Sequence, residues 1–93
     1  MGYYRVLLRC ELPDGFRIDD QPMSGFYTTR FVDASSEAAA GEAAIEALRR
    51  ETKFRALRAQ LTADPTITAE EVEPEKNRRA DAPLAGYLFH SDE

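Results

Sequence analysis

The sequence predicts an α+β fold, a two-layer sandwich in which a four-stranded, mainly antiparallel sheet carries helix on one face. The expected order is strand, strand, helix, short helix, strand, strand. Two strand-like segments lie in the first third of the chain, an alanine-rich amphipathic segment follows, and two further strand-like segments lie near the end. Strands joined by turns, with helices gathered in the middle, are typical of such a sandwich. We expect residues 1–93 to form a single compact domain.

The first strand is expected over residues 3–12, where the two sides of the segment differ in polarity. A period of two residues is typical of a half-buried antiparallel strand. The side that carries Val6, Leu8 and Cys10 should face the core. We therefore predict that Cys10 is a buried, inert thiol.

Residues 12–25 form a connection that is longer than a tight hairpin turn. The Pro-Asp-Gly tripeptide at 13–15 is a strong turn signal, because proline presets φ and glycine can adopt a positive φ. We expect residues 16–18 to extend a strand briefly and residues 19–24 to form a loop.

The second strand is expected over residues 25–33, which are rich in aromatic and β-branched residues. Ser35 or Ser36 can then accept hydrogen bonds from the first N–H groups of a helix, and Glu37 favours the same end. The helix should continue to about Glu51. Its expected apolar stripe, in steps of three and four residues, consists of Ala38, Gly41, Ala44, Ile45 and Leu48.

Beyond Glu51 the apolar residues change phase. On a continuous helix, Phe54, Leu57 and Leu61 would point roughly opposite to the preceding stripe. Either the helix breaks near Thr52 and a short second helix folds back, or one long helix presents its second half to another molecule. We favour the break, because so long a helix is unusual in a small domain.

The end of the chain supplies two more strands. Residues 66–73 form a weaker strand whose phase slips once, which is typical of a bulge or an edge position. Residues 74–83 are polar and are expected to be a loop. The last strand is expected over residues 84–90.

One face of the predicted sheet lacks helix and should carry apolar and aromatic side chains. The residues expected there are Tyr3, Arg5 and Leu7, together with Phe31 and either Phe26 or Tyr27. An apolar patch of this size is usually covered by a partner, and two-fold dimers are the commonest solution. We expect a homodimer. The residues Phe54 and Leu57 offer a second candidate interface.

The sequence contains few residues in arrangements that support catalysis. We find no metal-ligand spacing, no phosphate-binding loop and no nucleophile beside a base, so we assign no catalytic, cofactor-binding or metal-binding residue. His90 is expected to be solvated near the C-terminus. The pairs Asp19-Asp20 and Glu70-Glu71 lack the spacing of a calcium loop.

Composition limits the partners. The net charge is −5, from 12 basic and 17 acidic residues, and the basic residues are concentrated at 49–58. Such a domain should repel a phosphate backbone, so we expect no nucleic-acid partner. There is no long apolar run and no N-terminal secretion signal, so we expect no membrane partner and a cytoplasmic location. A single cysteine agrees with a reducing compartment.

Three motifs carry a resemblance to known proteins, namely YYRVLLR near the start, GFYTTRFVDASSEAA in the centre and AGYLFH near the end. The chain resembles small bacterial proteins that begin with a Tyr-Tyr-Arg strand, continue with Phe-Tyr-Thr-Thr-Arg and end in Gly-aromatic-x-aromatic. That group has no assigned activity, so the resemblance implies a compact bacterial α+β domain and no catalytic residue. The opening is also similar in outline to HicB-type antitoxins, in which such a domain binds a small toxin, although their short hairpin is replaced here by residues 12–25.

These observations predict a small non-enzymatic interaction or regulatory domain that acts through self-association or a protein partner. One alternative is a binder of small anionic ligands, in which Arg5, Thr28 and Arg30 meet an anion on the open sheet face. Another is an antitoxin-like partner protein. The sequence alone names no ligand, partner or pathway.

Overall fold

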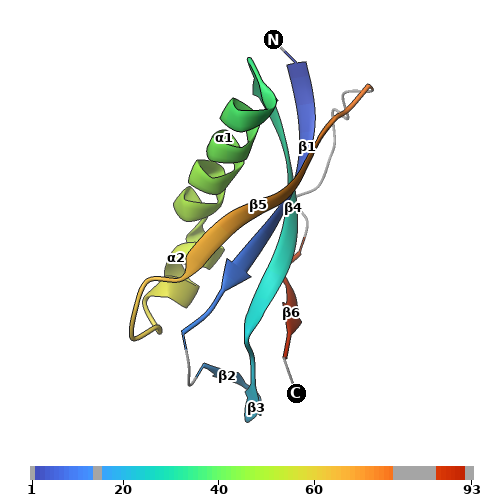
Figure 1. The fold of residues 1–93 in the computed structure, drawn as a ribbon. Coiled ribbons are helices and arrows are strands. Elements are labelled where there is room, and N and C mark those ends of the chain that lie inside the picture. The colour runs from blue at the N-terminus through green and yellow to red at the C-terminus, as the bar shows by residue number, and fades with distance from the viewer. Residues whose placement is uncertain (1, 14–15, 77–85, 92–93) are drawn as a thin grey trace.

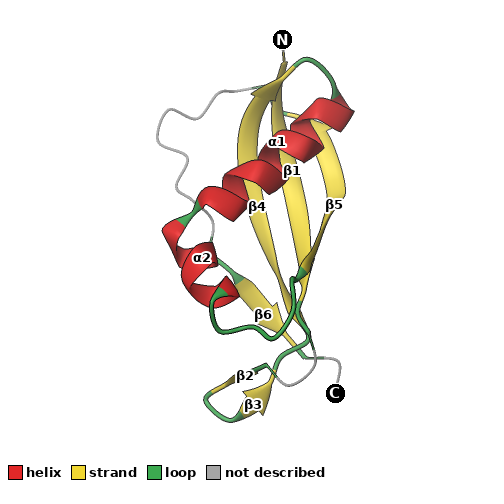
Figure 2. Ribbon diagram, turned by 90° about the vertical axis from the view of Figure 1, so that its left-hand side faces the viewer, coloured by secondary structure: helices red, strands yellow, loops and turns green. Residues whose placement is uncertain are grey.

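The computed structural model describes residues 2–13, 16–76 and 86–91. The two helices and the long strands build two layers, with α1 and α2 on one side of a twisted sheet (Figures 1 and 2). In chain order the elements are β1 (Gly2–Glu11), β2 (Arg17–Ile18), β3 (Gln21–Pro22), β4 (Gly25–Ala34), α1 (Glu37–Arg50), α2 (Thr52–Arg58), β5 (Thr66–Pro74) and β6 (Leu88–His90). The predicted α+β sandwich is confirmed.

The main sheet has the strand order β5-β1-β4-β6, and all of its pairings are antiparallel. The two longest strands, β1 and β4, form its centre and pair along ten residues. In this register Val6 lies opposite Arg30 and Leu7 lies opposite Thr29. Residues opposite each other share a face of the sheet, so the register decides which side chains meet.

The connection between β1 and β4 contains a small hairpin that the sequence pattern did not reveal. Strands β2 and β3 are joined by Asp19 and Asp20, whose φ angles are 50° and 68°. Two successive positive φ angles match the type I′ turn that suits the right-handed twist of a hairpin. Aspartate tolerates this region better than most residues, and a backbone oxygen of Asp20 accepts a hydrogen bond of 2.6 Å from Arg17. The acidic pair therefore builds the turn.

Helix α1 begins as predicted but buries a slightly different stripe. Ser36 is the N-cap, and its hydroxyl accepts a hydrogen bond of 3.2 Å from the backbone N–H of Ala39. The buried residues of the helix are Ala40, Gly41, Ala44 and Leu48. The prediction that Ala38 belongs to the stripe is wrong, because Ala38 is exposed and Ala40 faces the core instead. Ile45 is only half-buried.

The predicted helix break is confirmed. Glu51 has an extended backbone (φ −68°, ψ 138°) and separates α1 from α2. The change in direction returns Phe54 and Leu57 to the core, where both side chains are buried. The alternative of one long helix is wrong, and Phe54 and Leu57 are consequently not available as an interface.

Strand β5 is an edge strand with a bulge, as its slipped phase predicted. The register with β1 shifts between Leu7 and Leu8, so that Glu71 and Ala69 lie opposite these residues and Glu70 is the extra one. The strand extends to Pro74, one residue into the predicted loop.

The last strand is shorter than expected. Strand β6 begins at Leu88, and residues 86–87, which were assigned to it, precede it. The other two residues of the predicted strand, 84–85, and most of the predicted loop, 77–83, lie outside the described residues.

The core lies between the sheet and the helices. Its largest fully buried side chains belong to Phe26, Leu8, Leu48, Val6 and Cys10. The predicted burial of Cys10 is therefore confirmed, and the inward side of β1 is the one that the alternation indicated.

Candidate functional site

The face of the sheet opposite the helices carries half-buried aromatic and apolar side chains. Tyr3 and Leu7 come from β1, and Tyr27 and Phe31 come from β4. The rings of Tyr3 and Phe31 stack with centroids 6.0 Å apart and an interplanar angle of 18°. The open choice between Phe26 and Tyr27 is settled by the register, because Phe26 is fully buried on the helix side. We call this surface the open face.

The cations of the open face are neutralised within the chain. Arg5 donates a hydrogen bond to the carboxylate of Glu73, and this contact raises the pKa of Arg5. Arg9 pairs with Glu11 at 3.1 Å and with Glu70 at 3.4 Å. The open face is therefore an apolar strip whose two arginines have counter-charges, with the additional carboxylate of Glu71 at its β5 side.

The three residues of the predicted anion site do not come together. Arg5 lies on the open face, opposite Phe31, whereas Thr28 and Arg30 face the helices and are buried. Successive side chains on a strand point to opposite faces, and Arg5 lies opposite Phe31, not Arg30, so this separation follows from the register of β1 and β4. The assignment of Arg5, Thr28 and Arg30 to one site is corrected.

Arg30 instead forms the centre of a buried polar cluster. Its Nε and Nη2 donate to the two carboxylate oxygens of Glu51 at 2.6 and 2.7 Å. Its Nη1 donates to Thr28 Oγ1 at 2.5 Å and to the carbonyl oxygen of Thr29 at 2.7 Å. The Tyr87 hydroxyl donates to Glu51 Oε1 at 2.9 Å. A two-pronged guanidinium–carboxylate contact of this kind fixes geometry as well as charge.

The electrostatics of the cluster follow from its burial. Only 4% of the Arg30 side chain and 17% of the Glu51 side chain are exposed. Burial by itself raises the pKa of Glu51, but the hydrogen bonds from Arg30 and Tyr87 outweigh it and hold that pKa below its ordinary value. Burial, together with the Glu51 carboxylate, raises the pKa of Tyr87. At neutral pH Glu51 is therefore ionised and Tyr87 keeps its proton.

Aromatic contacts complete the surroundings of Tyr87. Its ring stacks on Phe26 at 4.5 Å, with an interplanar angle of 3°. The Lys53 ammonium lies 4.5 Å from the centre of the same ring. The cluster thus joins the sheet, the helix break and the segment before β6. Its role is architectural, because its donors and acceptors bind one another.

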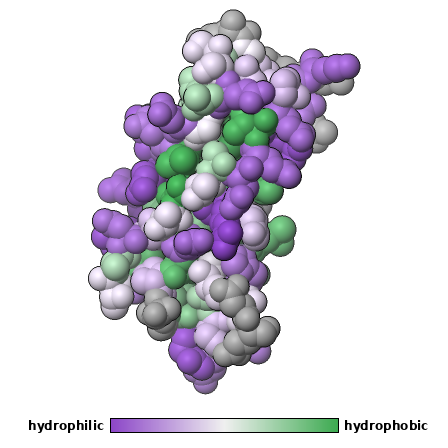
Figure 3. Space-filling model, in the orientation of Figure 1, coloured by the Kyte–Doolittle hydropathy of each residue, from purple (hydrophilic) through white to green (hydrophobic). Residues whose placement is uncertain are grey.

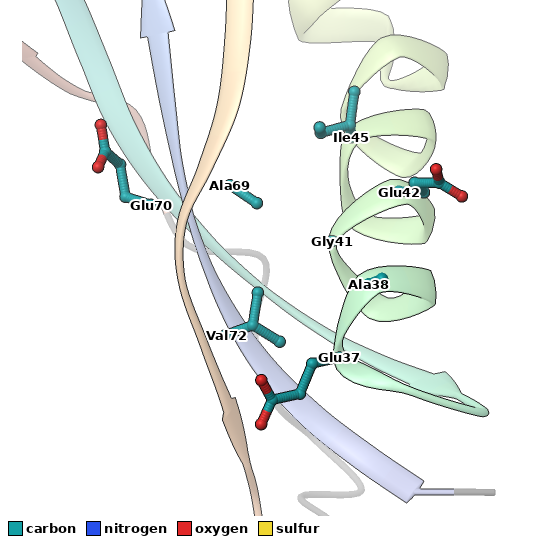
Figure 4. Close-up of a pocket in the computed structure, with 8 residues that line it drawn as sticks. All are labelled: Glu37, Ala38, Gly41, Glu42, Ile45, Ala69, Glu70 and Val72. Atoms are coloured by element: carbon teal, nitrogen blue, oxygen red, sulfur yellow. The ribbon is translucent and has the colours of Figure 1, made fainter.

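A groove runs between α1 and β5 and is drawn in Figure 4. Its volume is about 430 Å³. The apolar side chains and the glycine that line it are Ala38, Gly41, Ile45, Ala69 and Val72. Glu37, Glu42 and Glu70 also border it, but the side chains of Glu42 and Glu70 point away from the groove in Figure 4, and Glu70 pairs with Arg9. We call it the α1–β5 groove.

Gly41 brings the helix close to the edge strand at this groove. A Cβ atom at position 41 would lie 3.2 Å from the Cβ of Ala69. The surface view shows apolar residues in the region between α1 and β5, bordered by hydrophilic residues (Figure 3). The close approach predicted from Gly41 is therefore present.

A second hollow, of about 300 Å³, lies beside α2. It is lined by Arg49, Phe54, Arg55, Arg58 and Ala59. Arg58 is held there by an ion pair with Asp64. Three of the five basic residues at 49–58 thus line this hollow.

Two residues that could take part in catalysis, Cys10 and His90, are held within the fold. Burial raises the pKa of the Cys10 thiol to about 12, which keeps it protonated. His90 is half-buried, not solvated as predicted, because it lies in β6 opposite Gly25 and its ring is 5.2 Å from that of Tyr27. Among the described residues, no group of three or more His, Cys, Asp and Glu side chains is placed to hold a metal ion.

Comparison with protein-family models, with curated proteins and with solved structures gives no match for this chain. The two described helices are too short or too polar to cross a membrane.

Proposed function

We propose that this chain is a small non-enzymatic interaction domain that forms a two-fold homodimer through its open face. The observation that carries the proposal is the placement of Tyr3, Leu7, Tyr27 and Phe31 on the face opposite both helices. Covering these side chains removes apolar surface from water, which stabilises the dimer by about 25 cal/mol per Å² of apolar area.

The charges of the open face favour a second copy as the occupant. Arg5 is paired with Glu73, and Arg9 is paired with Glu11 and Glu70. Because each of these cations already has its counter-charge, the arginines of two identical faces do not repel each other strongly. A two-fold axis then brings the same apolar strip of each copy together.

The test is the oligomer mass of two matched variants. Leu7→Glu places a carboxylate in the centre of the open face, and we expect the dimer to dissociate in light scattering. Ala56→Glu adds the same charge on the exposed side of α2 and should leave the mass unchanged. Circular dichroism checks that both variants remain folded. A wild-type chain that stays monomeric up to roughly 0.5 mM, close to the millimolar affinity scale, would overturn the proposal.

Leu57→Glu is unsuitable for locating the interface. The side chain of Leu57 is buried under the sheet, so the substitution places a charge in the core. We expect it to unfold the domain, and a loss of oligomer mass would then carry no information on the interface.

A further inference from the structure

Strand β5 offers a second docking surface at the edge of the sheet. It is a terminal strand of nine residues, and in residues 2–13, 16–76 and 86–91 its backbone pairs with β1 alone. An exposed edge strand presents N–H and C=O groups that can pair with another extended segment. Protein partners are commonly bound in this way, with the backbone providing affinity and the side chains providing selection.

The α1–β5 groove lies beside this edge and can receive side chains from an added strand. Along such a strand, successive side chains point toward opposite faces of the sheet. Those on the helix side would meet the apolar surface of Ile45 and Val72, which point into the groove in Figure 4. Apolar residues at every second position therefore fit the groove.

The charges around the edge select the other residues of the added strand. The remaining side chains of the added strand point to the open-face side of the sheet, away from α1. On that side β5 carries Glu71, which lies opposite Leu7, and Glu73, which lies opposite Arg5. Basic residues at the remaining positions would meet the carboxylate of Glu71, because opposite charges on neighbouring strands attract and Glu73 is already paired with Arg5.

The same charges disfavour a second β5 as the occupant. Each copy of this strand carries Glu70, Glu71 and Glu73, so two copies side by side would place like charges together. The acidic edge therefore disfavours pairing between identical chains but attracts a segment of opposite charge. The bulge at Glu70 limits regular pairing to the residues on either side of it.

We propose that β5 and the α1–β5 groove bind an extended segment of a partner protein in which apolar and basic residues alternate. The segment adds a fifth strand beyond β5, its apolar side chains enter the groove, and its basic side chains meet Glu71 on the open-face side of β5. This inference goes beyond the homodimer and uses a different surface, so either can fail without the other.

Synthetic peptides test the proposal on the full chain. An eight-residue peptide that alternates valine and lysine should bind with a Kd below about 1 mM in fluorescence anisotropy. A block peptide with four lysines followed by four valines has the same composition and charge but lacks the alternation, and it should bind at least about tenfold more weakly. Equal binding of the two peptides, or no binding of the alternating one, would overturn the proposal.

Backbone methylation distinguishes strand addition from simple contact. N-methyl groups on one edge of the alternating peptide should abolish binding, whereas the same number on its other edge should leave it within about twofold. Only a peptide whose N–H groups pair with β5 shows this asymmetry. Equal effects of the two methylation patterns would contradict docking as a strand.

A matched pair of variants locates the site. Glu71→Lys reverses a charge on the open-face side of β5, and Glu46→Lys makes the same change on an exposed position of α1, away from the β5 edge. We expect the first to weaken the alternating peptide about fivefold to tenfold and the second to change its Kd less than about twofold. Equal weakening would mean that net charge alone attracts the peptide, which refutes docking at β5. Repeating the titration with Phe31→Glu, which charges the open face on β4 away from the β5 edge, separates this result from the fate of the homodimer.

Discussion

At the scale of single residues, Arg30 shows how one side chain can organise several segments. Its guanidinium binds Glu51 through two hydrogen bonds, and Tyr87 reaches the same carboxylate. Sequence reasoning placed Arg30 on the open face. The signal that it faces the core was present, because Arg30 shares its side of β4 with Phe26 and Thr28. An arginine on a core-facing position predicts a carboxylate partner, but the pattern does not say which of the 17 acidic residues it is.

Loss of the Glu51 charge should be strongly destabilising. Glu51→Gln leaves the Arg30 cation buried without its counter-charge, and breaking a buried pair in this way costs about 3 kcal/mol. Urea unfolding measures the loss. Glu46→Gln is the matched control, because Glu46 forms an exposed pair with Arg50 at 3.6 Å that contributes less than about 0.5 kcal/mol. Equal effects of the two variants would contradict the structural role of the cluster.

The same cluster should give the domain a dependence on acid. Folding lowers the pKa of Glu51 below its ordinary value of 4.5, because the hydrogen bonds from Arg30 and Tyr87 outweigh the effect of burial. Such a group stabilises the fold above its unfolded pKa, and the contribution is lost as the pH falls through the folded pKa. The stability difference between the wild type and Glu51→Gln should therefore be complete at pH 7 and begin to shrink below about pH 4.5. A difference that grows in acid would refute this assignment.

Cys10 should be unreactive in the folded protein. Its side chain is fully buried, and burial raises its pKa to about 12, so thiolate is scarce even in mildly alkaline buffer. A thiol reagent should react slowly with the native chain and rapidly after unfolding in urea. Rapid modification of the native chain at pH 8 would mean that the inward side of β1 opens frequently.

At the scale of elements, the sequence predicted β1, β4 and α1 correctly because their apolar residues recur at regular intervals. The strands β1 and β4 and the start of α1 at Ser36 follow from alternation and from capping chemistry. The buried stripe of α1 was harder to place, because the helix is rich in alanine and Ala38 and Ala40 are equally apolar. The β2–β3 hairpin was missed because its turn uses Asp-Asp in place of the usual glycine-containing pair.

Helix α2 should depend on its two buried side chains. Phe54→Ala removes a ring that is only 2% exposed, and such truncations cost about 3–5 kcal/mol. Leu88→Ala is the control, because Leu88 is 74% exposed and its truncation should stay within about 0.5 kcal/mol. Chemical denaturation compares the two variants. A negligible loss for Phe54→Ala would show that α2 is only loosely attached to the sheet.

The α1–β5 groove could not be derived from the sequence alone. Gly41 indicated a close approach, but the strand that approaches it is β5, which lies far along the chain. Neither a helical period nor a strand period states which elements become neighbours. The sequence likewise interpreted Glu37 only as a residue that favours the start of α1 and did not indicate that it borders an apolar groove.

At the scale of the whole molecule, the charge distribution disfavours nucleic acid as a partner. The net charge is −5, and the carboxylates of β5 extend along one edge of the sheet. We expect no binding of duplex DNA or RNA with a Kd below about 1 µM at physiological salt, since non-specific affinities usually lie at about 10⁻⁴–10⁻⁶ M. A filter-binding titration checks this. Tight, salt-dependent binding that disappears in an Arg49/Arg50/Lys53 triple alanine variant would refute the expectation and locate the site at 49–58.

The strand order β5-β1-β4-β6 has a consequence for how the chain is made. The two central strands and α1 all come from the first 50 residues, whereas both outer strands come from residues 66–90. The ribosome therefore synthesises β1 and β4 first, and the outer edges of this strand pair have no partner strand until residues 66–90 have emerged. The nascent chain therefore passes through a stage in which both edges of the β1–β4 pair expose unpaired backbone N–H and C=O groups. Chains that stall before residue 66 should aggregate more readily than complete ones.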